Sequence, residues 1–173
     1  TTPGTYEDDF NGNDGTGNAN PTATTDGIVD GAQTFDGSTT GIDVPADKSF
    51  NWAVDESFTI EFWVKRDGDV TGENQVAVGR VDSGSSLVWW VGIGDDTDAS
   101  TDQNMAAFVL EDTDGNDLVT VKGTKDITDN EWHHVVAVRD STADEILLYV
   151  DGETPASAST SYNAGFDSAT ADL

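Results

Sequence analysis

The side chains of this chain that could do chemistry are mostly oxygen donors. Its 173 residues include 34 Asp and Glu but only 7 Lys and Arg, two His and no Cys. A thiolate zinc site, a cysteine nucleophile and a disulfide framework are therefore excluded. Calcium, which takes about six to eight oxygen ligands, is the metal that this composition favours.

Two acidic segments have only part of the pattern of a calcium-binding loop. Asp96, Asp98, Ser100 and Asp102 have the first spacings of an EF-hand loop, but the glycine at its sixth position and the glutamate at its twelfth are missing. The Asp-Thr-Asp-Gly-Asn-Asp sequence of residues 112–117 lies between two apolar runs, which is typical of a hairpin turn. We expect both segments to be turns rather than metal sites.

The two histidines do not form a metal-binding or catalytic pair. His133 and His134 are adjacent within a predicted strand, so their rings point to opposite faces and cannot chelate the same ion. We expect one ring to be packed and the other to lie at the surface. No Ser-His-Asp set can be argued from them, and the glycine-containing loops lack the pattern of a phosphate-binding loop.

The net charge of −27 limits the partners of the chain. Nucleic acids and anionic membranes need Lys or Arg to replace their counterions, so both are poor partners. No apolar run approaches the ~18 residues of a membrane-spanning helix. Such a charge repels itself at low ionic strength, which favours salty or calcium-bearing water outside a cell. We therefore expect an extracellular location, at a cell surface or a virion surface.

The hydrophobic pattern predicts the all-β fold that would position these side chains. Asp outnumbers Glu by 26 to 8 and 18 Gly are present, which favours turns and strands over helices. Residues 57–65 alternate strictly, with Phe58, Ile60, Phe62 and Val64 on the face that we expect to be buried. Many short strands at near-regular spacing indicate one antiparallel β-sandwich or barrel spanning residues 1–173. Further strands are expected at residues 75–81, 87–93, 105–110, 118–121, 132–139 and 146–150, with shorter ones before residue 46.

Six fragments in a fixed order resemble a known family. They are residues 10–12 (FNG), 34–38 (TFDGS), 42–45 (IDVP), 57–65 (SFTIEFWVK), 131–138 (EWHHVVAV) and 148–153 (LYVDGE). Their order and spacing are similar to those of the laminin-G-like branch of the concanavalin A-like jelly rolls, in which two antiparallel sheets stack face to face. The resemblance implies a jelly-roll β-sandwich that recognises a ligand without catalysis.

The resemblance also implies strands that this sequence does not contain. Members of the family continue past a segment like residues 171–173 into a glycine turn and two more strands, whereas the sequence stops at Leu173. The N-terminal strand near residues 5–10 would then lack a neighbour, and an unpaired strand edge accepts other strands. We expect a strand from another copy, another protein or a continuation of the chain to fill this gap.

Related jelly rolls often hold a structural calcium ion between the first strand and a nearby turn. The matching residues here are Asp9, Asn11, Asp36 and Gly37, for which the resemblance implies a calcium site. Glucanases of the same fold use an E-x-D-x-x-E carboxylate pattern on one strand face. Residues 7–9 (Glu-Asp-Asp) are the nearest match but lack the last carboxylate, so a glycosidase is the lesser alternative and no catalytic residue is predicted.

Aromatic side chains are the candidate ligand contacts. On alternating strands about half of any aromatic set must face the core, and of the adjacent pair Trp89 and Trp90 one ring points inward and the other outward. We expect Trp90, and Trp52 in the loop before residues 57–65, to be ligand contacts, with Trp63 and Trp132 as further candidates. The predicted function is an extracellular recognition or adhesion module that binds a glycan or a protein, as part of a larger surface, secreted or viral appendage protein. The alternative is a structural building block of a filament, shell or fibre assembled by strand complementation.

Overall fold

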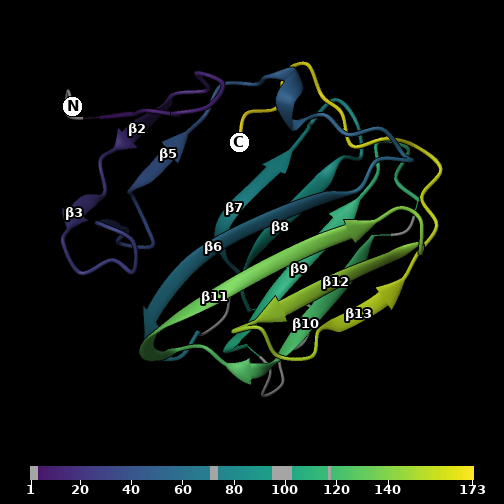
Figure 1. Cartoon of the computed structure of the whole chain (residues 1–173). Coiled ribbons are helices and arrows are strands. Elements are labelled where there is room, and N and C mark those ends of the chain that lie inside the picture. Colours follow the sequence, from purple (N-terminus) through teal and green to yellow (C-terminus); the bar gives the residue numbers. More distant parts are fainter. Residues whose placement is uncertain (1–3, 71–73, 95–102, 117) are drawn as a thin grey trace.

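The computed structural model describes residues 4–70, 74–94, 103–116 and 118–173. These residues form strands and one short 3-10 helix (Figure 1). The N-terminal elements are β1 (Thr5–Tyr6), β2 (Gly15–Ala19), β3 (Thr22–Thr24), β4 (Ala32–Thr34), β5 (Gly41–Asp43) and the helix η1 (Lys48–Phe50). The later strands are β6 (Phe58–Asp67), β7 (Gln75–Val81), β8 (Val88–Ile93), β9 (Met105–Glu111), β10 (Val119–Asp126), β11 (Asp129–Asp140), β12 (Glu145–Val150) and β13 (Ala156–Ser159).

The later strands form two four-stranded antiparallel sheets. One sheet has the order β13-β12-β11-β6 and the other has the order β10-β9-β8-β7. In Figure 1 the first sheet lies across the second, so the two sheets stack as the layers of a β-sandwich. The prediction of an antiparallel β-sandwich with almost no helix is confirmed. In the part of the chain that the structure describes, no helix has the length and hydrophobicity needed to cross a membrane.

Period-two alternation decides which side chains form the core between these sheets. The predicted inner face of β6, made of Phe58, Ile60, Phe62 and Val64, lies in or packs against the main core, whereas Glu61 is exposed. The predicted register of β6 is therefore confirmed, and burial of these side chains favours folding. The other strands contribute core side chains that are 1% exposed or less: Trp89, Val91, Phe108, Leu110, Val135, Ile146 and Leu148.

Two small sheets in the first 46 residues lie beside the sandwich. Strands β1, β2 and β5 pair in the order β1-β2-β5, and β3 pairs with β4. These strands are short, as expected for a polar segment that is rich in Gly, Asn, Asp and Thr. Large apolar side chains of this segment are exposed to solvent: Phe10 is 94% exposed and Val29 is 77% exposed. In Figure 1 this segment lies to one side of the two stacked sheets.

A buried arginine holds the C-terminal segment against the end of the sandwich. Arg80 of β7 is 1% exposed, and its guanidinium donates to the carbonyls of Ser168 and Ala171 at 2.7 and 2.9 Å. It also donates to the carbonyl of Phe50 and to Asn51 Oδ1, each at 2.8 Å. These oxygens replace the water that the guanidinium loses on burial. Arg80 thereby joins β7, the loop after η1 and the last residues of the chain.

The side of the sandwich next to the N-terminal segment has two unpaired strand edges. Strands β6 and β7 each end their sheet, and the described residues provide no second neighbour for either. Near this side, Val44 and Leu173 each donate a backbone N–H to the other's carbonyl at 2.9 Å. Such an exchange has the form of one rung of an antiparallel ladder. The expectation that a further strand joins this side is compatible with these edges but is not tested by them.

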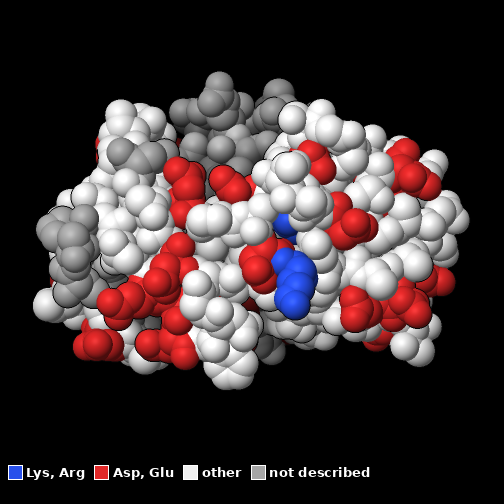
Figure 2. All heavy atoms as spheres, turned by 90° about the horizontal axis from the view of Figure 1, so that it is seen from above, with Lys and Arg blue, Asp and Glu red and all other residues white. Residues whose placement is uncertain are grey.

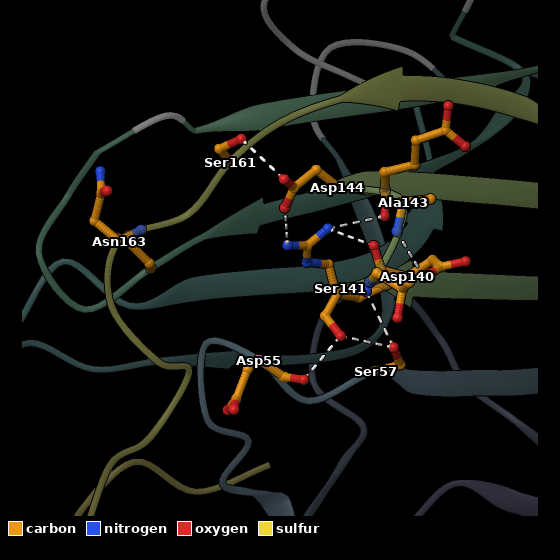
Figure 3. Close-up of polar contacts among 12 residues, drawn as sticks. Asp55, Ser57, Asp140, Ser141, Ala143, Asp144, Ser161 and Asn163 are labelled. Carbon is orange, nitrogen blue, oxygen red and sulfur yellow. Dashed lines mark hydrogen bonds and ion pairs between the residues drawn. The ribbon is translucent and has the colours of Figure 1, made fainter.

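Figure 3 shows the turn between β11 and β12, with Asp140 and Asp144 labelled. This turn is held by a second buried arginine, Arg139. Its Nη1 donates to the carbonyls of Asp140 and Glu145 at 2.7 and 3.2 Å. Its Nη2 lies 3.2 Å from Asp144 Oδ1, and Ser161 Oγ donates to the other oxygen of that carboxylate at 3.3 Å. Asp144 has a left-handed backbone, with φ of 52°, a conformation that Asp adopts more readily than most residues. We assign this polar network a structural role.

Candidate functional site

An aromatic pair lies on the outer face of the sheet that contains β6 and β11. Trp63 of β6 is directly opposite His134 of β11, and their ring centroids are 4.9 Å apart with planes inclined by 25°. Trp63 is 44% exposed and is the most exposed of the five tryptophans, all of which are described. The stacked pair therefore presents an open indole surface to solvent.

A carboxylate borders this stacked pair. Glu61 precedes Trp63 by two residues, so the alternation of β6 places both side chains on the outer face. Its Oε2 lies 3.4 Å from His134 Nε2, and the side chains of Glu61 and His134 are 65% and 31% exposed. At this distance and exposure the contact is weak. The oxygens of Glu61 can therefore accept hydrogen bonds from a ligand. We call Glu61, Trp63 and His134 the aromatic platform.

The aromatic platform is bounded at one end by Trp132. This residue precedes His134 by two positions on β11 and lies opposite Lys65 of β6. Its half-buried indole donates its N–H to the carbonyl of Asp26 at 2.9 Å. The hydrogen bond attaches the segment between β3 and β4 to this end of the platform. Trp132 is thus fixed by the protein itself, whereas Trp63 is open.

The composition of the aromatic platform suits binding rather than bond breaking. An indole face packs against apolar C–H groups, and a carboxylate accepts hydrogen bonds from hydroxyl groups. Glycoside hydrolysis needs two carboxyl groups, about 5 Å apart in retaining enzymes and about 6.5–9.5 Å apart in inverting ones. Of the three platform residues only Glu61 carries a carboxyl group.

A buried histidine lies beneath the platform, on the inner face of β11. His133 is 3% exposed, with Nδ1 at 2.8 Å from Asp151 Oδ2 and Nε2 at 3.0 Å from Asp129 Oδ1. Burial alone would lower the pKa of His133, but the hydrogen bonds to Asp129 and Asp151 outweigh it and raise the pKa above 6.5. The prediction that the two histidine rings face opposite sides, one packed and one at the surface, is confirmed.

The residues predicted to hold calcium lie in two separate turns. Asp9 and Asn11 are exposed in the turn before β2, at the Asp43 end of the β2–β5 ladder. Asp36 and Gly37 precede β5 and lie at the other end of that ladder. The structure therefore does not bring the two turns together.

The Asp36 carboxylate is already occupied within its own turn. It accepts hydrogen bonds from the Thr39 hydroxyl, from the backbone N–H groups of Ser38, Thr39 and Thr40, and from the Thr40 hydroxyl. These bonds, with the Thr39 hydroxyl first, hold the pKa of Asp36 well below its usual range. In the described ranges no group of three His, Cys, Asp or Glu side chains is arranged to bind a metal. The calcium site stays a prediction without support from this geometry.

Asp112, in the second acidic segment, is a buried turn residue. Its carboxylate accepts backbone N–H groups of Asp114 and Asn116 within the turn, and of Asn163 and Ala164 from the C-terminal segment, each at 3.1 Å. The side chain is 0% exposed, so it fastens the β9–β10 hairpin to the C-terminal segment. The predicted hairpin turn is confirmed. The acidic segment from Asp96 to Asp102 lies outside the described residues.

The two tryptophans predicted as ligand contacts are packed against the protein. Trp52 stacks on Phe58, with ring centroids 3.9 Å apart and planes inclined by 13°. Trp90 faces away from the main core, as predicted, but is 9% exposed because it packs with Ala107 and Val109 on the outer face of its sheet. No observation tests whether either ring contacts a ligand. The open ring is that of Trp63, which the alternation of residues 57–65 already places on the outer face.

The fold agrees with what comparison with known proteins finds. A sequence model described as the Concanavalin A-like lectin/glucanases superfamily, of laminin G type, matches residues 36–172, so the chain belongs to this family. The family resemblance inferred from the six fragments is thereby confirmed. No curated protein matches the chain.

Two solved structures match the chain. The binding domain of Paraclostridial Mosquitocidal Protein 1 matches with a TM-score of 0.74 and 17% identity, covering 94% of this chain and 39% of that one. A candidate carbohydrate-binding protein from Bacteroides ovatus matches with a TM-score of 0.46 and 19% identity, covering 79% of this chain and 40% of that one. The chain thus spans about two fifths of the length of each. The first match shows that this fold also forms a binding domain in another protein.

Proposed function

We propose that the chain is a non-catalytic carbohydrate-recognition module that acts outside a cell and binds a glycan on the aromatic platform. The observation that carries the proposal is the exposed Trp63 ring, stacked on His134 and bordered by the Glu61 carboxylate. Tryptophans in this chain are otherwise half-buried or buried. Leaving one large ring open costs favourable burial, and the open ring offers an aromatic face on which a ligand can pack.

A sugar ring fits the chemistry of the aromatic platform. One face of a pyranose presents C–H groups, which pack on an indole, and its edge presents hydroxyl groups, which donate to a carboxylate. His134 widens the apolar surface and contacts Glu61 at 3.4 Å. Membership of a superfamily that includes lectins supports a glycan ligand.

The charge of the protein favours neutral glycans over sulfated or otherwise polyanionic ones. The net charge is −27, and Asp and Glu side chains are spread across the face seen in Figure 2, with few Lys or Arg among them. A polyanion approaching such a surface is repelled over about the 8–10 Å of the Debye length at physiological salt. We therefore propose uncharged oligosaccharides as the ligand class.

The test is a binding panel of immobilised, uncharged hexasaccharides built from glucose, mannose, xylose or N-acetylglucosamine. We expect the wild type to bind at least one of them and Trp63→Ala to weaken that binding by about tenfold, as expected for the loss of an aromatic contact worth about 1.4 kcal/mol. Phe10→Ala is the matched control, since it removes another exposed ring, 94% exposed, from the N-terminal turn. Equal loss in both variants, or no binding by the wild type, would contradict the proposal.

A second function, self-association by strand addition, is favoured by a different observation. Strands β6 and β7 end their sheets without a second neighbour among the described residues, and β7 carries the exposed apolar side chains of Val76 and Val81. Unpaired backbone N–H and C=O groups at such edges accept a strand from another chain. We propose that a second copy supplies it, which would suit a structural building block. Molar mass measured by light scattering over a range of concentrations tests this, because a constant monomer mass excludes it.

A further inference from the structure

His133 is a buried titratable residue that the aromatic platform does not use. Both of its ring nitrogens face carboxylate oxygens, Nδ1 at 2.8 Å from Asp151 Oδ2 and Nε2 at 3.0 Å from Asp129 Oδ1. A neutral imidazole has one N–H group, so one of the two carboxylates would then face a nitrogen lone pair. Only the doubly protonated imidazolium donates to both. The geometry therefore favours a charged ring at this position.

The carboxylate of Asp151 joins this ring to both sheets. Asp151 follows β12, and its Oδ2 also lies 2.5 Å from Lys125 Nζ of β10, in the opposite sheet. Its Oδ1 accepts the backbone N–H of His134 at 2.9 Å. One side chain thus connects β10, β11 and the end of β12. We call Lys125, Asp129, His133 and Asp151 the ion cluster.

The charged groups around the ion cluster are mostly acidic. Within the cluster Asp129 and Asp151 face His133, and Lys125 faces Asp151. Just outside it, Asp126 interacts with Asp129, and Glu153 interacts with Lys125. On β6 the residue paired with His133 is Val64, which carries no charge. Loss of the proton from His133 would leave Lys125 as the one cation among these described groups, facing several carboxylates.

We propose that protonated His133 is a pH-sensitive latch that closes this end of the sandwich and is released when the ring loses its proton. The latch lies directly under the aromatic platform, because His133 and His134 are consecutive residues of β11 whose side chains point to opposite faces. The shared Asp151 carboxylate holds the backbone of His134 in place. The inference does not depend on a glycan ligand.

The direction of the pH dependence follows from the two opposing effects on His133. Burial is the largest single effect and lowers its pKa, but the hydrogen bonds to Asp129 and Asp151 and the charges of these two carboxylates together outweigh it, so the folded-state pKa lies above the ordinary 6.5. A group whose pKa is raised by folding stabilises the folded state most below its unfolded pKa. That stabilisation is lost as the pH rises through the folded pKa. The latch is therefore closed below the folded-state pKa of His133 and opens as the pH rises through it.

Two measurements test the latch on the intact chain. The first is an NMR titration of the imidazole protons of the wild type, in which His133 should titrate with a midpoint above 6.5. The second is the melting temperature between pH 6 and pH 9 for the wild type, His133→Gln and the matched control His134→Gln. The melting temperatures of the wild type and the control should fall by several degrees over this range. The melting temperature of His133→Gln should be lower than that of the wild type at pH 6 and should not change with pH.

The outcomes separate a latch from a merely structural histidine. A His133 midpoint at or below 6.5 would overturn the inference. So would a His133→Gln variant whose melting temperature falls with pH as steeply as that of the wild type. If His133→Gln does not fold, the wild-type titration alone decides, because it needs no variant.

Discussion

Trp63 and His134 occupy directly opposite positions on β6 and β11, and their rings stack with centroids 4.9 Å apart. The two residues are far apart in the sequence and are brought together by the register of one antiparallel ladder. A slip of that ladder by one residue would move His134 to the inner face and His133 to the surface. The aromatic platform and the ion cluster beneath it therefore depend on the same register.

The core face of β6 provides a first test of the fold. Phe62→Ala should destabilise the protein by about 3 kcal/mol, and Phe108→Ala by about 5 kcal/mol. Phe108 is fully buried in the middle of its sheet, whereas Phe62 is partly exposed because β6 is an edge strand. Glu61→Ala should change the stability by less than about 0.5 kcal/mol. Urea unfolding measures all three, and a Glu61 variant that is less stable than the Phe62 variant would contradict the register.

The buried carboxylate of Asp112 provides a second test. Asp112→Ala would leave four backbone N–H groups without their acceptor, including those of Asn163 and Ala164. A hydrogen bond to a charged acceptor contributes about 1.5–3 kcal/mol, so the loss of these four part-buried bonds should cost at least about 3 kcal/mol.

Asp114→Ala is the matched control for that variant, because Asp114 lies in the same turn with an exposed side chain. The melting temperature of Asp114→Ala should be close to that of the wild type. Similar losses in the two variants would mean that the turn does not depend on the Asp112 carboxylate.

Calcium provides a third test. If calcium raises the melting temperature of the wild type, Asp9→Ala should leave that rise unchanged, because Asp9 and Asp36 lie at opposite ends of the β2–β5 ladder. An ion at about 100 times its dissociation constant adds about 2.7 kcal/mol of stability, which melting detects easily. Melting curves with millimolar calcium and with a chelator give the comparison. A rise that disappears in Asp9→Ala would restore the site implied by the family resemblance.

The sequence was sufficient to predict the sandwich because its strands alternate clearly. The alternation of residues 57–65 indicates which side chains face the core and which face solvent. In the adjacent pairs Trp89–Trp90 and His133–His134, the two side chains point to opposite faces, as period two requires. These are local properties of a strand, so they can be inferred without knowing its neighbours.

The candidate site was less predictable because it depends on contacts between distant segments. Trp52 was expected to be open in its loop, but that loop folds back so that the ring stacks on Phe58. The pairing of Trp63 with His134 is set by ladder register, which alternation alone does not determine. The donors to the Asp112 carboxylate include backbone N–H groups of the C-terminal segment, which no local pattern connects to the β9–β10 turn.

The most direct test of the proposed function is an NMR titration of the five tryptophan indole N–H signals with the uncharged hexasaccharide that binds best in the panel. The signal of Trp63, assigned by its absence from Trp63→Ala, should shift most, because its ring is 44% exposed in the aromatic platform. The signals of Trp52 and Trp89 should move little, because both rings pack in the core. Saturable shifts of Trp90 or Trp52 with an unmoved Trp63 signal would contradict the aromatic platform as the binding site.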